Sequence, residues 1–168
     1  KLYYESVLKA EPTNPISEDS LRLMRLGTIV HNDIQKALTL YSNNVSNNNV
    51  EKKININLQK KETKFSVEGE IRIKELNVRG FYDIVTEDDK VYLFDIKTAG
   101  SYSWSKKFGK KVDFNPSIHY ELQLGTYGYA IEKEFGRLDG MYLMFYNKDN
   151  SRMRPVEIPL MYKSRAYL

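Results

Sequence analysis

Cysteine is absent from the 168 residues of this chain, which excludes disulfide bridges and any cysteine-ligated iron–sulfur cluster. Long apolar runs are also absent. None approaches the roughly 18 residues of a membrane-spanning helix, so we expect no membrane partner. The first segment, KLYYESVLKAEPTN, becomes polar within a few residues and does not resemble a signal peptide. These absences favour an intracellular protein.

The overall composition is that of a soluble globular protein. Hydrophobic residues make up 41% of the chain and charged residues 29%. This balance and the length predict a single domain over residues 1–168, with an irregular lead-in over 1–16 that Pro12 and Pro15 interrupt. The net charge of +4 is compatible with a nucleic-acid partner but does not establish one.

Apolar periodicity predicts helices and strands that alternate along the chain. The expected elements are a helix from Ser17 to about Tyr41, strands within 51–76, a hairpin within 79–100, a helix from 117 to Phe135, and strands at 140–146 and 154–160. This order predicts an α/β domain with a mixed central β-sheet flanked by helices. Gly27 interrupts the first helix at a cost of up to about 1 kcal/mol against Ala, which indicates close backbone packing at that point.

The stretch RGFYDIVTEDDKVYLFDIKTAG, residues 79–100, predicts a β-hairpin around a polar turn at Thr86–Lys90. If Val85 lies opposite Val91, Asp83 lies opposite Leu93. Asp83 and Asp95 are then diagonal neighbours on one face, roughly 7 Å apart, and Lys97 shares that face. On the opposite face, we expect three side chains to point toward the main core: Tyr92, Phe94 and Ile96.

Two carboxylates at this separation can bind one small hard cation such as Mg²⁺. The alternative is a solvated salt-bridge cluster of Asp83, Asp95 and Lys97 on an exposed face. The neighbouring residues are too apolar for a solvent face, and burying two like charges is costly without a cation. The hairpin therefore favours a metal site.

Three spaced motifs sharpen this prediction. Asp83 precedes the triplet Asp95-x-Lys97, Gly27-x-x-x-His31 lies upstream, and Gln123-x-x-x-Tyr127 lies downstream. The ordered set spans about 100 residues and resembles the RecB-type exonuclease branch of the PD-(D/E)XK nuclease superfamily, which includes CRISPR adaptation nucleases and mitochondrial genome-maintenance exonucleases. Two departures are visible: Tyr82 replaces the proline of the "PD" half, and Asp95 replaces the more frequent glutamate.

The resemblance implies a restriction-endonuclease-like fold and a metal-dependent DNA nuclease. It implies one or two Mg²⁺ or Mn²⁺ ions held by His31, Asp83, Asp95 and the backbone carbonyl of Ile96. Lys97 is then the catalytic lysine, and Gln123 and Tyr127 contact the scissile phosphate or Lys97. His31 considered alone is more typical of a hydrogen-bonded packing histidine. Glu68 and Glu70 are either site acids or the solvent-facing half of a strand.

The substrate implied is single-stranded DNA or DNA ends, cut by an exonuclease in replication, recombination or repair. A helicase or another replication or recombination protein is a partner that the resemblance allows. Two alternatives stay open: a structure-specific endonuclease of the same fold, and a nuclease-fold module that binds nucleic acid without cleaving it.

Residues 101–117, SYSWSKKFGKKVDFNPS, show no clear periodicity and are expected to form a long loop. Basic and aromatic side chains alternate there: Trp104, Lys106, Lys107, Lys110 and Lys111. Cations meet phosphates and rings stack on bases, so this composition suits single-stranded nucleic acid. An ordinary solvated lysine loop is the alternative.

Overall fold

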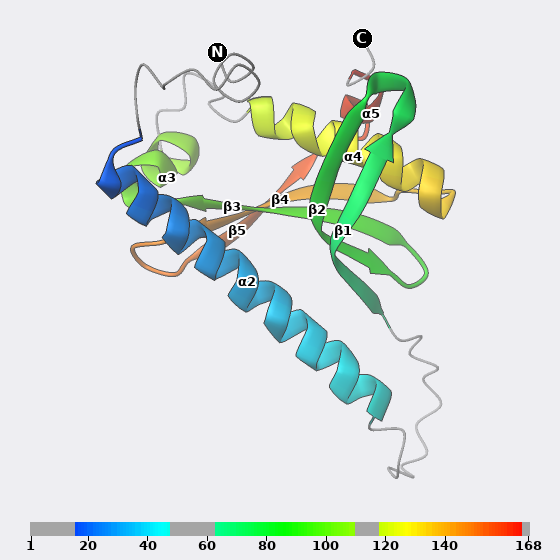
Figure 1. Cartoon of the computed structure of the whole chain (residues 1–168), viewed down its shortest axis with the longest axis horizontal. Helices are drawn as coiled ribbons and strands as arrows, with labels where there is room; N and C mark the ends of the chain where they lie inside the picture. Colours follow the sequence, from blue (N-terminus) through cyan, green and yellow to red (C-terminus); the bar gives the residue numbers. More distant parts are fainter. Residues whose placement is uncertain (1–15, 48–62, 110–117, 166–168) are drawn as a thin grey trace.

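The computed structural model describes residues 16–47, 63–109 and 118–165, with the side chains of 42–47 and 165 excepted. The first part of the expected strand region 51–76, residues 51–62, lies outside the described residues, as do Lys110 and Lys111. Figure 1 shows the chain as a twisted sheet with helices on both faces. The predicted α/β class with a mixed central sheet flanked by helices is confirmed.

Five strands form one sheet in the order β1-β2-β3-β4-β5. Their bounds are β1 Lys64–Ile73, β2 Val78–Glu87, β3 Val91–Ala99, β4 Gly140–Asn147 and β5 Met153–Ile158. A 3₁₀ turn at Lys74–Leu76 joins β1 to β2. Neighbouring strands are antiparallel except for β3 and β4, which are parallel. As expected for a strand with Pro155, β5 lies at an edge.

Helix α4, Ile118–Phe135, covers one face of the sheet and encloses the main core. It ends before Gly136, whose positive φ of 73° suits a glycine after a helix. The fully buried side chains between helix and sheet include Leu93, Leu124, Ile131, Met141 and Leu143. Helix α5, Tyr162–Arg165, packs against α4.

The core lies on the other side of β3 from the expected one. Val91 and Leu93 belong to the core cluster, whereas Tyr92 and Phe94 are half-buried and pack around the Tyr142 ring. Both faces of this strand are apolar, so alternation alone could not tell which face the larger helix covers. Only Ile96, the third residue of that set, is fully buried.

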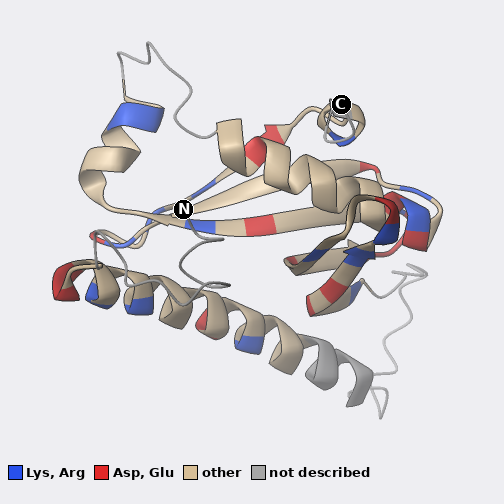
Figure 2. Ribbon diagram, turned by 45° about the horizontal axis from the view of Figure 1, so that its top comes forward, with Lys and Arg blue, Asp and Glu red and all other residues tan. Residues whose placement is uncertain are grey.

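Helix α2, Glu18–Asn47, lies across the opposite face of the sheet, as Figure 2 shows, and packs against β1, β2 and β3. The Ser17 hydroxyl accepts the N–H of Ser20 at 3.2 Å and caps its first turn. A Cβ added at Gly27 would lie only 3.1 Å from Thr98 Oγ1, so the expected close packing at this glycine is confirmed. Leu23 and Tyr41 of this helix are 57% and 61% exposed.

The β2–β3 hairpin forms with a register shifted by two residues from the predicted one. Val85 lies opposite Leu93, not Val91, because the turn is shorter and only 88–90 separate the strands. A shift of two residues preserves the faces of a strand. Asp83 and Asp95 therefore still fall on the same face by alternation, although their predicted partners were wrong.

The expected loop after β3 begins as a helix. Helix α3, Ser101–Phe108, follows β3 directly, and the Asp149 carboxylate accepts the N–H of Ser101 at its start, at 2.6 Å. Among the helices that the structure describes, none is both long enough and apolar enough to cross a bilayer.

Candidate active site

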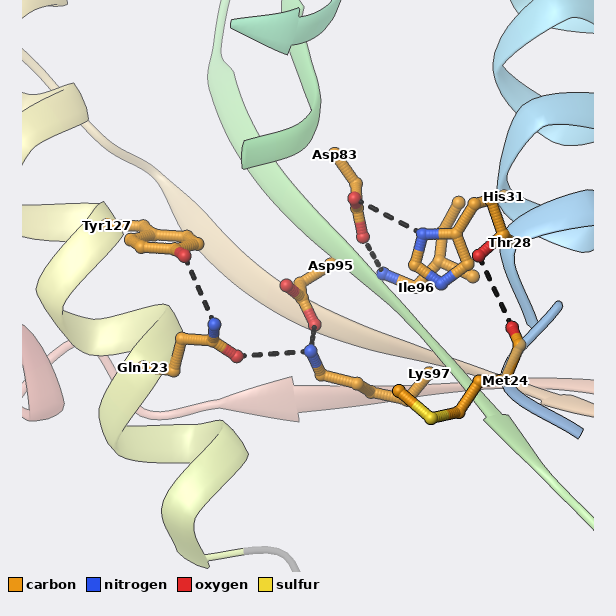
Figure 3. Close-up of polar contacts among 9 residues, drawn as sticks. All are labelled: Met24, Thr28, His31, Asp83, Asp95, Ile96, Lys97, Gln123 and Tyr127. Carbon is orange, nitrogen blue, oxygen red and sulfur yellow. Dashed lines mark hydrogen bonds and ion pairs between the residues drawn. The ribbon is translucent and has the colours of Figure 1, made fainter. Parts of the chain in front are cut away.

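The predicted site residues gather at a fork in the sheet. Strands β2 and β3 pair from the turn only as far as Ile84 and Phe94. Beyond that pair, β2 continues along β1 while β3 continues along β4. Asp83 is the first residue of β2 past the fork and Asp95 the first of β3. The divergence leaves backbone groups and two carboxylates facing one gap, which Figure 3 shows from the side of the site.

Asp83 occupies the gap between the strands. Its Oδ2 accepts the backbone N–H of Ile96 at 2.6 Å and so satisfies a group that the divergence would leave unpaired. Its Oδ1 lies 3.4 Å from Nδ1 of His31, on the middle of α2. The hydrogen bond with Asp83 raises the pKa of His31 above its ordinary value, although partial burial opposes the change. His31 of α2 therefore lies beside Asp83, one of the two aspartates of the predicted site.

Asp95 is a buried carboxylate, 5% exposed. Burial raises its pKa to about 6, and the nearby Lys97 ammonium opposes that rise. Asp95 Oδ2 lies 2.6 Å from Lys97 Nζ, an ion pair in which the atoms are not aligned as a hydrogen bond. Among the described residues this oxygen has no aligned donor. A buried carboxylate in this state favours an additional cation.

Lys97 joins the strands to helix α4. Its Nζ donates to Gln123 Oε1 at 3.1 Å, and Gln123 Nε2 donates to the Tyr127 hydroxyl at 3.1 Å. The Tyr127 ring lies against Gly80 of β2, where a side chain larger than hydrogen would collide with it. The Gln123-x-x-x-Tyr127 motif thus forms a relay that holds the lysine from the α4 side (Figure 3).

The structure separates the two glutamates of β1. Glu70 lies 2.6 Å from both Arg72 Nε and Arg79 Nε, so it belongs to an exposed ion-pair cluster. Glu68 lies where the β1–β2 pairing skips one residue pair, opposite Asp83, with a positive φ of 52°. It lines a shallow open cavity together with His31. A left-handed non-glycine residue beside such a site is an unusual feature that favours a functional role for Glu68 over Glu70.

The donor groups at the fork suit a hard divalent cation. Two carboxylates and one imidazole face the gap, and the carbonyl of Ile96 is expected to point the same way as its N–H. As they stand, no three histidine or acidic side chains among the described residues lie close enough to hold a metal ion together. Instead, each carboxylate contacts a basic side chain: Asp95 pairs with Lys97, and Asp83 lies beside His31.

Comparisons with known proteins identify no family for this chain. No family model matches the sequence, and no curated protein matches it. Fourteen chains of solved structures are similar, among them one described as the crystal structure of SSO0001. This chain shares 18% identity with that structure at a TM-score of 0.49, over 99% of its own length. It spans 66% of the other chain, just under two thirds. Nothing about activity follows from this similarity.

The basic and aromatic residues after β3 divide between two sides of α3. Trp104 and Phe108 pack against the core, and Lys107 Nζ lies 4.7 Å from the centre of the Phe145 ring. Lys106 instead lies over the exposed Tyr102 ring, at 4.5 Å. The helical spacing of Trp104 and Phe108, four residues apart, was the sequence signal for this arrangement.

Two further residues near the site were not predicted. Tyr120, on the first turn of α4, places its ring 4.7 Å from Lys97 Nζ. Lys148, just after β4, lines the same open cavity as His31 and Glu68. Sequence spacing gave no signal for either, because both reach the site only through the parallel pairing of β3 with β4 and the packing of α4.

Proposed function

We propose that this chain is a metal-dependent DNA nuclease that hydrolyses phosphodiester bonds, acting as an exonuclease on single-stranded DNA or DNA ends. One observation supports the proposal above the others. The residues of the three sequence motifs, which run from Gly27 to Tyr127, come from α2, β2, β3 and α4 and meet at one fork. A merely structural ion-pair cluster would not require a glutamine–tyrosine relay onto its lysine.

His31, Asp83, Asp95 and the Ile96 carbonyl would hold Mg²⁺ or Mn²⁺ in this proposal. When bound, such an ion supplies a water of lowered pKa and stabilises charge on the phosphate. Asp83 has a second task, because it also accepts the Ile96 N–H and so keeps the fork in shape. His31 would serve as a ligand in its neutral form, because metal binding requires a neutral imidazole.

In addition to the metal ion, the side chain of Lys97 would supply positive charge at the site. It lies between Asp95 and Gln123, with 17% of its side chain exposed. From this position its ammonium can orient a water or stabilise charge that develops on a phosphate oxygen. Gln123 and Tyr127 act as positioning residues, since they hold the ammonium from the side of α4.

Digestion of linear and circular single-stranded DNA with Mg²⁺, Mn²⁺ or EDTA tests the proposal. We expect metal-dependent loss of the linear form only. Asp83→Ala, Asp95→Ala and Lys97→Ala should each lower cleavage by at least about 10²-fold. Asp33→Asn, an exposed position on α2, serves as the control with unchanged cleavage. Circular dichroism checks that each variant stays folded.

The other outcomes are equally informative. Cleavage of circular DNA would reassign the activity to an endonuclease of the same fold. DNA binding without cleavage of either form would identify a non-cleaving module. Full activity in any of the three alanine variants would contradict the residue assignment even if the chain is a nuclease.

A further inference from the structure

A cavity of about 470 Å³ lies beside the candidate active site, between the N-terminal part of α2, α3 and the start of α4. Its volume is in the range of small-ligand sites, roughly 300–1,000 Å³. Aromatic rings form much of its wall: Trp104, Phe108, Tyr120 and Phe145. This cavity has no part in the metal site or in the relay to Lys97.

The aromatic cavity is continuous with the site. Thr98, the residue after Lys97, lines both this cavity and the open cavity around His31, and so does Lys148. The ring of Tyr120 belongs to the cavity wall and also lies 4.7 Å from Lys97 Nζ. The Tyr120 ring therefore links the cavity wall to the ammonium of Lys97.

Positive charge accompanies the rings. Lys148 stands at the junction of the two cavities, and Lys107 lines the aromatic one with its Nζ 4.7 Å from the Phe145 ring centre. The acid at the rim, Asp149, is engaged with the N–H of Ser101. A wall of aromatic rings with two lysines suits a flat aromatic ligand with an anionic group attached.

We propose that the aromatic cavity receives an unpaired nucleobase of the strand whose phosphate lies at Asp95 and Lys97, and that Lys148 contacts a neighbouring phosphate. The inference rests on the proposed nuclease function and adds the reason for single-strand preference. Bases of a duplex are paired and stacked, whereas a single strand can place one base between aromatic side chains. Lys106 and Tyr102 do not line the cavity and have no part in this proposal.

Trp104 is the only tryptophan of the chain, so its fluorescence reports on the cavity directly. The test titrates oligo-dT of about ten nucleotides into the full chain in EDTA, with an abasic oligonucleotide of the same length as the comparison. We expect saturable quenching of Trp104 by oligo-dT. We also expect binding of the abasic strand to be weaker by about tenfold or more, because it keeps the phosphates and lacks the stacking bases.

Two variants place the effect in the cavity. Ser103 is an exposed residue of α3 that lines the aromatic cavity, so Ser103→Leu narrows this cavity. The variant should lose most of the difference in affinity between oligo-dT and the abasic strand. Lys148→Ala should weaken both strands and reduce the salt dependence of binding, as expected for a lost phosphate contact. Lys74→Ala is the matched control, because Lys74 lies far from the cavity. Its neighbour Glu75 pairs with Lys133 at the C-terminal end of α4, whereas Tyr120 is on the first turn of that helix.

Equal affinity for the two oligonucleotides, or unchanged Trp104 emission at saturation, would overturn the inference. The binding assay needs no cleavage, so the two proposals can fail separately. Metal-dependent cleavage without base-dependent quenching would leave the nuclease and reject the base cavity. Base-dependent quenching that Ser103→Leu removes, in a chain that cleaves nothing, would support the cavity and reject the nuclease.

Discussion

The ammonium of Lys97 lies 2.6 Å from a carboxylate oxygen of Asp95 and 3.1 Å from the amide oxygen of Gln123. The carboxylate is buried, so its charge depends on a nearby cation. The amide belongs to an exposed residue, which water could hydrate equally well. These two contacts therefore have different effects. The ion pair with Asp95 balances the negative charge of the site, whereas the hydrogen bond to Gln123 fixes the orientation of the Lys97 side chain.

This difference predicts that Gln123→Leu lowers cleavage by about 10- to 100-fold with little change in Tm, since the relay is lost but no core contact is. Gln123→Glu should restore most of the rate, because it keeps an oxygen acceptor for Lys97. Tyr127→Phe should have a smaller effect, since it removes only the hydroxyl that accepts from Gln123.

Steady-state cleavage and thermal unfolding of the three variants measure these effects. Glu134→Gln, an exposed change on the same helix, is the control. If Gln123→Leu cleaved at the wild-type rate, Gln123 would be only a surface residue. If Gln123→Glu were as poor as Gln123→Leu, positioning of Lys97 through an oxygen acceptor would be excluded.

At the scale of elements, the starts of the parallel strands β3 and β4 are tied by one residue. The Asp139 N–H donates to the Val91 carbonyl and the Asp139 carboxylate accepts the Val91 N–H, both at 2.8 Å. Arg137 donates two hydrogen bonds to the same carboxylate, at 2.8 and 2.7 Å. These hydrogen bonds hold the pKa of Asp139 below its usual range. The bonds from Arg137 have the largest effect, and the bond from the Val91 N–H has the next largest.

A lowered folded-state pKa means that the charge of Asp139 stabilises the fold above its unfolded pKa of about 3.9, and that this stability is lost as pH falls through the folded value. Asp139→Asn keeps an oxygen for Val91 but removes the charge. We expect it to lower the urea midpoint at pH 7, with the difference from wild type closing below about pH 4. A constant difference from pH 7 to pH 3 would show that geometry, not charge, is what Asp139 contributes.

Local patterns in the sequence predicted several elements and misplaced others for physical reasons. The helix at 118–135 follows from local periodicity and was predicted. The hairpin register was not, because the polar run from Thr86 to Lys90 is compatible with more than one turn length. Helix α3 was missed because its apolar residues are few, and its stability depends on packing against Phe145 and on the Asp149 contact with its first N–H.

For the molecule as a whole, the candidate site connects two layers that the sheet otherwise separates. Helix α2 brings His31 from one face and helix α4 brings Gln123 from the other, and they meet because β2 and β3 part at Asp83 and Asp95 (Figures 2 and 3). The motifs could predict which residues assemble. They could not predict the fork, Tyr120 or Lys148, since these depend on long-range strand pairing that no local pattern encodes.

A site formed by α2, β2 and β3 together predicts that a bound metal ion stabilises the whole fold. An ion that binds only the folded chain raises stability by about 2.7 kcal/mol at 100 times its Kd. For a chain of this length that corresponds to an increase in Tm of about 5–10 °C. We expect Mn²⁺ or Mg²⁺ to produce this increase and EDTA to reverse it.

Differential scanning fluorimetry over a Mn²⁺ titration measures this effect without any nucleic acid. Asp95→Asn should lose most of the increase, since it removes the charge of the buried carboxylate that we propose as a ligand. Glu70→Gln, in the separate ion-pair cluster with Arg72 and Arg79, should keep it. An equal increase in Tm in wild type and Asp95→Asn would place the metal elsewhere on the chain. Lys97 would then be the permanent counter-ion of Asp95 rather than the neighbour of a metal ion.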